Sequence, residues 1–346
     1  MTNFTNVQVI APNFKKRLSG VTATIVRLVP IQARDIGIVA TGPVLPEHVP
    51  QIPLHALITM PRRPARVWHA RRNVEMIGGL ALKYLLRKNL KLVFTSASQR
   101  KQTKLTRWLI RRMDAVVATS DKTAGYLENP ATVIMHGIDL EGYAPAPDRA
   151  ALRAKLGLPV EGILIGCYGR IRRSKGTDVF ATAMAGVNKR LPTHALIMGR
   201  AVPKDEKFLQ SIKDEVTKTG LTDHFHFLPE VPVEDMADWY RVLDLYVAPQ
   251  RSEGFGLTPI EAMACGVPVI ATRVGAFEQI VTPQTGLLVD TDDPAELINA
   301  ICEAFEPPCP IKDWAKNTRP HVAEHFSIER EAAELITLYR RLLKKS

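Results

Sequence analysis

Short apolar runs rich in β-branched residues alternate along this chain with longer amphipathic stretches. Consecutive strands of a parallel sheet need a long crossover, usually a helix, so this alternation predicts parallel sheets covered by helices. The runs are too many for one sheet of ordinary width, and we expect two doubly wound sheets in two domains. The predicted strands are residues 7–11, 36–40, 91–95, 115–119, 132–135, 162–168, 194–198, 225–228, 243–248, 267–271 and 286–289.

The predicted helices lie between these strands, over residues 65–88, 104–113, 205–219, 233–240 and 294–305, with a last one at 328–343. The segment 142–148 contains Tyr-Ala-Pro-Ala-Pro-Asp, which can continue neither a helix nor a strand ladder. We therefore expect one domain over residues 1–142 and a second over residues 148–327.

Several protein classes are disfavoured by the sequence. No run of about 18 apolar residues is present, and residues 1–20 lack an apolar stretch followed by a small-residue cleavage site. We therefore expect a cytoplasmic protein without a membrane-spanning helix. The four cysteines lie far apart without Cys-x-x-Cys spacing, which predicts neither a disulfide framework nor a zinc site.

The positive charge is concentrated in the first part of the chain. The formal net charge is +11, yet residues 1–150 alone hold 22 Lys and Arg against 9 Asp and Glu, a balance of +13. Such asymmetry suggests an anionic partner for this half. Nucleic acid, an anionic membrane surface and a phosphorylated substrate each satisfy the pattern, and a solvated helix face is the simpler alternative.

The segment 243–271 has the order of an anion site: a buried strand, a glycine-bearing loop and a helix start. Free main-chain N–H groups and the helix dipole favour negative charge at such a helix start. Glu253 in the loop and Glu261 in the first helical turn can face the same crevice and accept hydrogen bonds from sugar hydroxyls. Two structural alternatives remain: Glu253 as a solvated loop acid, and Glu261 as the capping-box partner of Thr258.

A second loop follows the strand at 162–168 and places Arg170 and Lys175 before another helix start. Its glycine and lysine spacing is not that of a Walker A loop. A guanidinium fork and an ammonium together suit a diphosphate. The alternative is a basic surface turn.

These motifs closely resemble those of the family 4 retaining glycosyltransferases of the GT-B fold. The resemblance is strongest over 249–271, which contains the loop with Glu253 and the helix with Glu261. Residues 275–278, 286–289 and 137–139 also match, as do Gly169-Arg170 and Lys175-Gly176. It covers roughly residues 130–330 strongly and the first half only by layout.

The resemblance implies a role for each matching position. Arg170 and Lys175 would neutralise the diphosphate of a sugar-nucleotide donor, Glu261 would hold its ribose, and Glu253 would hold the transferred sugar. A first-domain loop with Gly20 would close on the donor, and residues 328–346 would pack back on the first domain. The remaining donor-binding positions are Val231, against which the base would lie, and the loop and helix start formed by Gly254, Phe255, Gly256, Leu257 and Thr258.

Two positions depart from the family pattern. Many relatives have a His after a first-domain strand near the reacting sugar, where this chain has Ser96. His69 could reach the site instead, although a His on an amphipathic helix is more often structural.

The resemblance implies retaining transfer from a nucleoside diphosphate sugar, and it extends to bacterial lipopolysaccharide core mannosyltransferases, which use GDP-mannose. No Asp-x-Asp follows a strand, so we expect transfer without a metal. The basic first domain would bind an anionic lipid-linked glycan, with peripheral contact to the cytoplasmic face of the inner membrane. The alternatives are a UDP-sugar donor with another acceptor and, in a different class, a nucleic-acid-binding protein. Few aromatic residues stand among the basic residues of the first half, which disfavours nucleic-acid binding.

Overall fold

The computed structural model describes residues 4–15 and 20–344, and the chain forms two compact units. Unit 1 comprises Met1–His136 with Ile328–Ser346, and unit 2 comprises Gly137–Ser327. Each unit has its own parallel sheet, with 7 strands in unit 1 and 6 in unit 2 among the described residues. The prediction of two doubly wound α/β domains is therefore confirmed.

The sheet of unit 1 has the strand order β3-β2-β1-β4-β5-β6-β7. Its strands are β1 (Val9–Pro12), β2 (Ile38–Thr41), β3 (Gln51–Ile52), β4 (Arg66–Ala70), β5 (Leu90–Ser96), β6 (Ala115–Ala118) and β7 (Thr132–Val133). Its helices are α1 (Gly20–Gln32), α2 (Ala56–Thr59), α3 (Asn73–Tyr84), α4 (Lys104–Ile110), α5 (Asp121–Gly125) and α14 (Ile328–Lys344).

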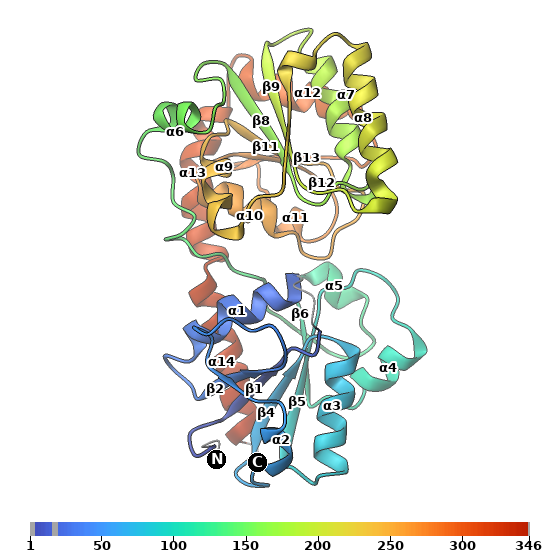
Figure 1. The fold of residues 1–346 in the computed structure, drawn as a ribbon, viewed down its shortest axis with the longest axis vertical. Helices are drawn as coiled ribbons and strands as arrows, with labels where there is room; N and C mark the ends of the chain where they lie inside the picture. Colours follow the sequence, from blue (N-terminus) through green and yellow to red (C-terminus); the bar gives the residue numbers. More distant parts are fainter. Residues whose placement is uncertain (1–3, 16–19, 345–346) are drawn as a thin grey trace. The chain divides into compact units, whose positions relative to one another are not determined.

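Helices cover both faces of this sheet (Figure 1). One apolar cluster joins α1 and α14 to the sheet, and a second joins α2, α3 and α4 to the opposite face. Strand side chains alternate between the two: Val67 belongs to the first cluster and Trp68 to the second. This alternation is the period of two expected for a sheet buried on both sides.

The last helix, α14, packs beside α1 in unit 1 (Figure 1). Leu335, Ile336 and Tyr339 on its apolar stripe are buried in the α1 cluster. Two polar contacts add to this packing: His136 Nδ1 lies 2.8 Å from Glu331 Oε1, and Arg340 donates to the carbonyl of Asp35. The chain thus crosses to unit 2 and returns to complete the core of unit 1.

The helix predicted over residues 65–88 is wrong in its first part, because residues 66–70 form strand β4. All five side chains of this strand are buried. Arg66, which looked like the polar face of a helix, instead donates to the main-chain carbonyls of Val7 and Phe4, among others. A charged residue whose partners are distant carbonyls is not distinguishable from a solvated one in the sequence.

Unit 2 has the strand order β10-β9-β8-β11-β12-β13. Its strands are β8 (Ile163–Tyr168), β9 (Thr193–Met198), β10 (Phe225–Leu228), β11 (Leu245–Ala248), β12 (Val269–Thr272) and β13 (Gly286–Val289). Its helices are α6 (Arg149–Lys155), α7 (Thr177–Val187), α8 (Glu206–Lys218), α9 (Met236–Arg241), α10 (Leu257–Ala264), α11 (Phe277–Ile280), α12 (Pro294–Phe305) and α13 (Ile311–His325). Helix α7 contacts both α8 and α12, and α10 contacts both α9 and α13 (Figure 1).

The division between the units falls after His136 rather than at residues 142–148. Two arginines of unit 2 hold the intervening segment. Arg241 donates to the carbonyls of Gly142 and Ala144, and Arg319 donates to those of Leu140 and Tyr143. The prolines of this segment do prevent regular structure, but the guanidinium contacts make it part of unit 2.

In the part of the chain that the structure describes, no helix combines the length and apolar character needed to cross a membrane. All four cysteines are described and are free thiols, three of them buried.

Candidate active site

The predicted donor-binding residues of unit 2 gather at one edge of its sheet. All strands are parallel, so the loops after β8, β9, β10, β11 and β12 leave the same edge. The strand order reverses direction between β8 and β11, and the crevice at such a switch point is where open α/β sheets bind ligands. The loop with Arg170 and Lys175 follows β8, and the loop with Glu253 follows β11.

Gly176 sets the course of the loop after β8. It has φ +69°, and a Cβ on it would lie 1.8 Å from the carbonyl oxygen of Pro249. Only glycine can make this close approach in the left-handed conformation. The contact joins the start of α7 to the first residue after β11, and it thereby brings Lys175 to the loop that carries Glu253.

Lys175 and Glu253 form an ion pair, in which Nζ donates to Oε2. Their side chains are 21% and 19% exposed, so both are largely withdrawn from water yet open to a ligand. The other carboxylate oxygen of Glu253 accepts from the amide of Gly254 at 2.8 Å. Arg170 is exposed and has no hydrogen-bonding partner among the described residues. The structure thus brings Lys175 and Glu253 into contact and leaves the Arg170 guanidinium available.

The turn before α10 is tightly packed. Phe255 is buried, and Gly256 has φ +88°, where a Cβ would lie 2.2 Å from the ring of Phe277. The helix begins at Leu257, so the amides of Leu257 and Thr258 are in its first turn, where N–H groups lack intrahelical acceptors. These amides are available to an anion at this edge of the sheet.

The capping box considered for Glu261 is wrong. The N-cap of α10 is Gly256 rather than Thr258, and no side chain caps the helix. Glu261 Oε2 instead accepts a hydrogen bond of 2.8 Å from Tyr240 Oη on α9. Burial, and next the charge of Glu261, raise the pKa of Tyr240 well above its usual value, so the phenol remains a donor. Because α10 starts two residues earlier than the capping box requires, Glu261 is not at its N3 position, and its carboxylate reaches Tyr240 on α9.

Two positioning residues, Tyr240 and Arg251, were not predicted from the sequence. Arg251 forms a bidentate pair with Asp178 of α7, with N···O distances of 2.8 and 2.9 Å. Its amide also donates to the carbonyl of Ser174. Arg251 therefore fixes the loop after β11 to the loop after β8. A lone Tyr or Arg carries no signal in one sequence, so neither could have been found beforehand.

The remaining predicted positions lie as follows. Val231 is half-buried in the loop after β10, at the same sheet edge as Lys175. Gly20 is the first residue of α1 in unit 1, and the loop before it, residues 16–19, lies outside the described residues. Among the described residues, no three His, Cys, Asp or Glu side chains form a group that could hold a metal ion.

His69 and Ser96 belong to neighbouring strands of unit 1. His69 lies in β4 and not on a helix, and it is buried between Tyr339 Oη and Thr95 Oγ1 at 2.5 and 2.6 Å. Burial, with a smaller effect of Arg71, lowers its pKa well below 6.5, so the imidazole is neutral. Ser96 ends β5 and is 2% exposed. His69 ties α14 to the sheet, which is a structural role.

Two doubly wound units, one of which presents two acids, cations and helix N–H groups at the switch point of its sheet, define the GT-B class of glycosyltransferases. Among solved structures, the chain is similar to Anabaena Alr3699/HepE in complex with UDP, with a TM-score of 0.83, 18% identity and coverage of 97% of this chain and 100% of that one. The chain belongs to the family of glycosyl transferases group 1, whose model matches residues 148–321.

Two curated relatives are similar along nearly the whole chain. The lipopolysaccharide core biosynthesis mannosyltransferase LpsB of Rhizobium meliloti (strain 1021) is 45% identical, over 99% of this chain and 100% of that protein. The mannosyltransferase LpcC of Rhizobium leguminosarum bv. viciae, of the same description, is 47% identical over 99% of each. The predicted glycosyltransferase activity is thereby confirmed.

Proposed function

We propose that this enzyme transfers mannose from GDP-mannose, with retention of configuration, to a hydroxyl of an anionic lipid-linked glycan of the lipopolysaccharide inner core. The observation that carries the proposal is the identity of 45% and 47% to two lipopolysaccharide core mannosyltransferases over 99% of this chain. The GT-B fold and the crevice of unit 2 supply the physical basis for it.

In this proposal, the departing diphosphate is stabilised by cations and dipoles. Arg170 and Lys175 approach it from the loop after β8, and the amides of Leu257 and Thr258 from the start of α10. Such preorganised donors stabilise charge that develops in the transition state. We propose that they take the place of a metal ion, so that transfer needs none.

The two acids then bind hydroxyl groups. Glu261, oriented by Tyr240, accepts from the ribose, and Glu253, oriented by Lys175 and the Gly254 amide, accepts from the sugar. With both acids so engaged, neither serves as a covalent nucleophile. This favours attack on the face of the departing diphosphate, which itself assists removal of the acceptor proton.

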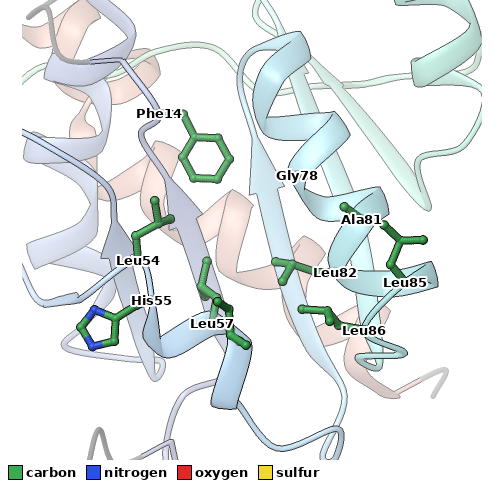
Figure 2. A pocket seen from close by; sticks show the side chains of 10 residues that line it. Phe14, Leu54, His55, Leu57, Gly78, Ala81, Leu82, Leu85 and Leu86 are labelled. Atoms are coloured by element: carbon green, nitrogen blue, oxygen red, sulfur yellow. The ribbon is translucent and has the colours of Figure 1, made fainter.

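The lipid part of the proposal draws on an apolar pocket of unit 1 (Figure 2). Its volume is about 700 Å³, and its lining includes Leu54, just before α2, Leu57 and Ile58 of α2, Leu82 of α3 and Leu85, the C-cap of α3. Leu54, Ile58 and Leu85 are 48%, 64% and 79% exposed. Exposed apolar groups of this size beside basic residues are typical of peripheral contact with an anionic bilayer.

Two basic residues follow Leu86 of the pocket lining in the sequence: Arg87 is exposed and Lys88 is buried. Lys88 donates to the carbonyl of Ile58 at 2.8 Å, and burial, followed by the charges of Arg62 and Arg66, lowers the pKa of Lys88. We propose contact with the cytoplasmic face of the inner membrane through this surface. Co-sedimentation with phosphatidylglycerol vesicles tests it: Ile58→Ser with Leu85→Ser should reduce binding, whereas Val160→Ser, at an exposed site of unit 2, should not.

The donor assignment is tested by isothermal titration with GDP, UDP and ADP in the absence of magnesium. We expect GDP to bind most tightly, and Lys175→Ala to weaken binding by about tenfold, because a charge-assisted contact is lost. Tighter binding of UDP than of GDP would show that the donor is a UDP-sugar rather than GDP-mannose. If none of the three nucleotides binds, the result favours the alternative function, in which the basic first domain binds nucleic acid. Nuclear magnetic resonance of the product then reports whether the configuration is retained.

A further inference from the structure

A polar pocket lies at the carboxyl ends of β4 and β5 in unit 1. Its volume is about 290 Å³, at the lower limit of ligand pockets and suited to a single sugar residue. The lining includes four cations and several hydroxyl groups, among them Arg71, Arg72, Ser96, Ser98, Arg100 and Lys101. None of the described residues that line it is Asp or Glu.

The place of this pocket in the sheet is that of a ligand site. The strand order of unit 1 reverses between β1 and β4, and the pocket lies in the loops that leave the carboxyl ends of β4 and β5. Ligands of open parallel sheets bind at this edge. The turn after β5 is fixed by the amide of Ser98, which donates to Ser96 Oγ.

One of the four cations is structural, and the others are not. Arg72 donates to Glu75, whose side chain is fully buried, and also to Asn13 and Thr22. The Arg71 guanidinium donates only weakly, to the carbonyl of His69 at 3.3 Å. The side chains of Arg71, Arg100 and Lys101 have no carboxylate partner among the described residues, although the Arg71 amide donates to Glu75. The pocket therefore carries positive charge that the described part of the chain does not neutralise.

We propose that this pocket binds the negatively charged group of an acidic sugar, a carboxylate or a phosphate ester, in the acceptor. This inference rests on the proposed function, since it names the part of the acceptor that unit 1 recognises. The guanidinium forks of Arg71 and Arg100 match the two oxygens of such an anion. Ser98 and Thr103, which also line the pocket, can bond the sugar hydroxyls.

The experiment titrates the full-length protein with D-glucuronate, D-glucose 6-phosphate, D-glucose and inorganic phosphate, followed by ligand-observed nuclear magnetic resonance. The test variant is Arg71→Gln with Arg100→Gln, which leaves the Arg72–Glu75 pair intact. The matched control is Arg27→Gln with Arg34→Gln, which removes the same charge from unit 1 outside the pocket. GDP is titrated into all three proteins.

We expect the charged sugars to bind at least about tenfold more tightly than glucose, and the test variant to lose about tenfold in affinity for them. The control variant should bind them as the unchanged protein does, and GDP should bind all three equally. The tighter of the two charged sugars identifies the anion as carboxylate or phosphate.

Three results would overturn the inference: charged sugars that bind no better than glucose, affinity that survives in the test variant, or inorganic phosphate that binds as tightly as the sugars. Absence of GDP binding would count against the proposed function instead, because the donor site lies in unit 2 and the pocket in unit 1.

Discussion

Gly176 is subject to two separate constraints, a left-handed backbone and the carbonyl of Pro249 at the place of a Cβ. Gly157 has nearly the same φ, +68°, but no atom within 4 Å of its Cβ position. We expect Gly157→Ala to cost about 1 kcal/mol, the usual penalty of that conformation. Gly176→Ala should cost at least about 2 kcal/mol more, because the two loops must separate. Denaturant unfolding measures both, and equal losses would contradict the role given to the contact.

The phenol of Tyr240 orients Glu261, and Tyr240→Phe removes only that hydrogen bond. We expect GDP to bind about fivefold more weakly, equivalent to about 1 kcal/mol, with the fold intact because the ring keeps its packing. The loss should disappear with 2′,3′-dideoxy-GDP, which has no ribose hydroxyls for Glu261 to hold. An equal loss with both nucleotides would show that Tyr240 acts on the fold rather than on ribose recognition.

Some site residues can be predicted from the sequence and others cannot, and the difference depends on where their partners lie in the chain. Lys175 and Glu253 each follow a strand at a recognisable turn, so the order of strand, loop and helix brings them to one sheet edge. Tyr240 and Arg251 act through partners far away in the chain, Glu261 and Asp178. Such pairings depend on how helices pack, and one sequence does not encode them in any local pattern.

At the scale of elements, a group of histidines lies on β9, on β10 and directly before β10. The rings of His194 and His224 stack at 5.1 Å, and His226 Nε2 lies 3.2 Å from His194 Nδ1. Burial lowers the pKa of His194 and of His226 below the ordinary value of 6.5, and the neighbouring histidines lower each further. The two strands therefore place imidazoles against one another whose protonated form is disfavoured.

This group makes stability depend on pH. The pKa of these histidines is lower in the folded than in the unfolded chain. As the pH falls through about 6.5, the unfolded chain therefore binds more protons than the folded one, and the free energy of unfolding decreases. We expect the Tm to fall between pH 7.5 and 5.5, and to fall less in His226→Gln than in the unchanged protein. His69 contributes to the pH dependence of Tm in the same direction. Because His69 is present in both proteins, the difference between their Tm curves reports the histidines of β9 and β10 alone. Parallel Tm curves would contradict this.

Strands and helices were predicted best where their pattern was purely apolar. Strands β8 to β13 lie where the alternation places them. The sequence predicts the start of a helix where strand β4 lies, because Arg66 and His69 are polar residues whose buried partners, carbonyls and Tyr339, are remote in the chain. A polar pattern predicts an exposed face, and this prediction fails where the polar or charged side chain is buried against distant partners.

For the whole molecule, the two separate cores predict two unfolding transitions. Leu335→Ala on α14 removes a side chain that is 3% exposed in the core of unit 1, and it should destabilise that unit by about 2–5 kcal/mol. GDP should raise only the transition of unit 2, where the donor residues lie. Calorimetry with and without GDP checks this, and a Leu335→Ala effect on the GDP-sensitive transition would contradict the division.

The return of α14 to unit 1 also sets the order in which the protein is completed on the ribosome. Unit 2 has its whole sequence by Ser327, and it can fold as soon as that residue has emerged. The first 136 residues emerge earlier but lack the helix that closes one face of their sheet. The amino-terminal unit therefore finishes last, and until then its open apolar face is a target for chaperones.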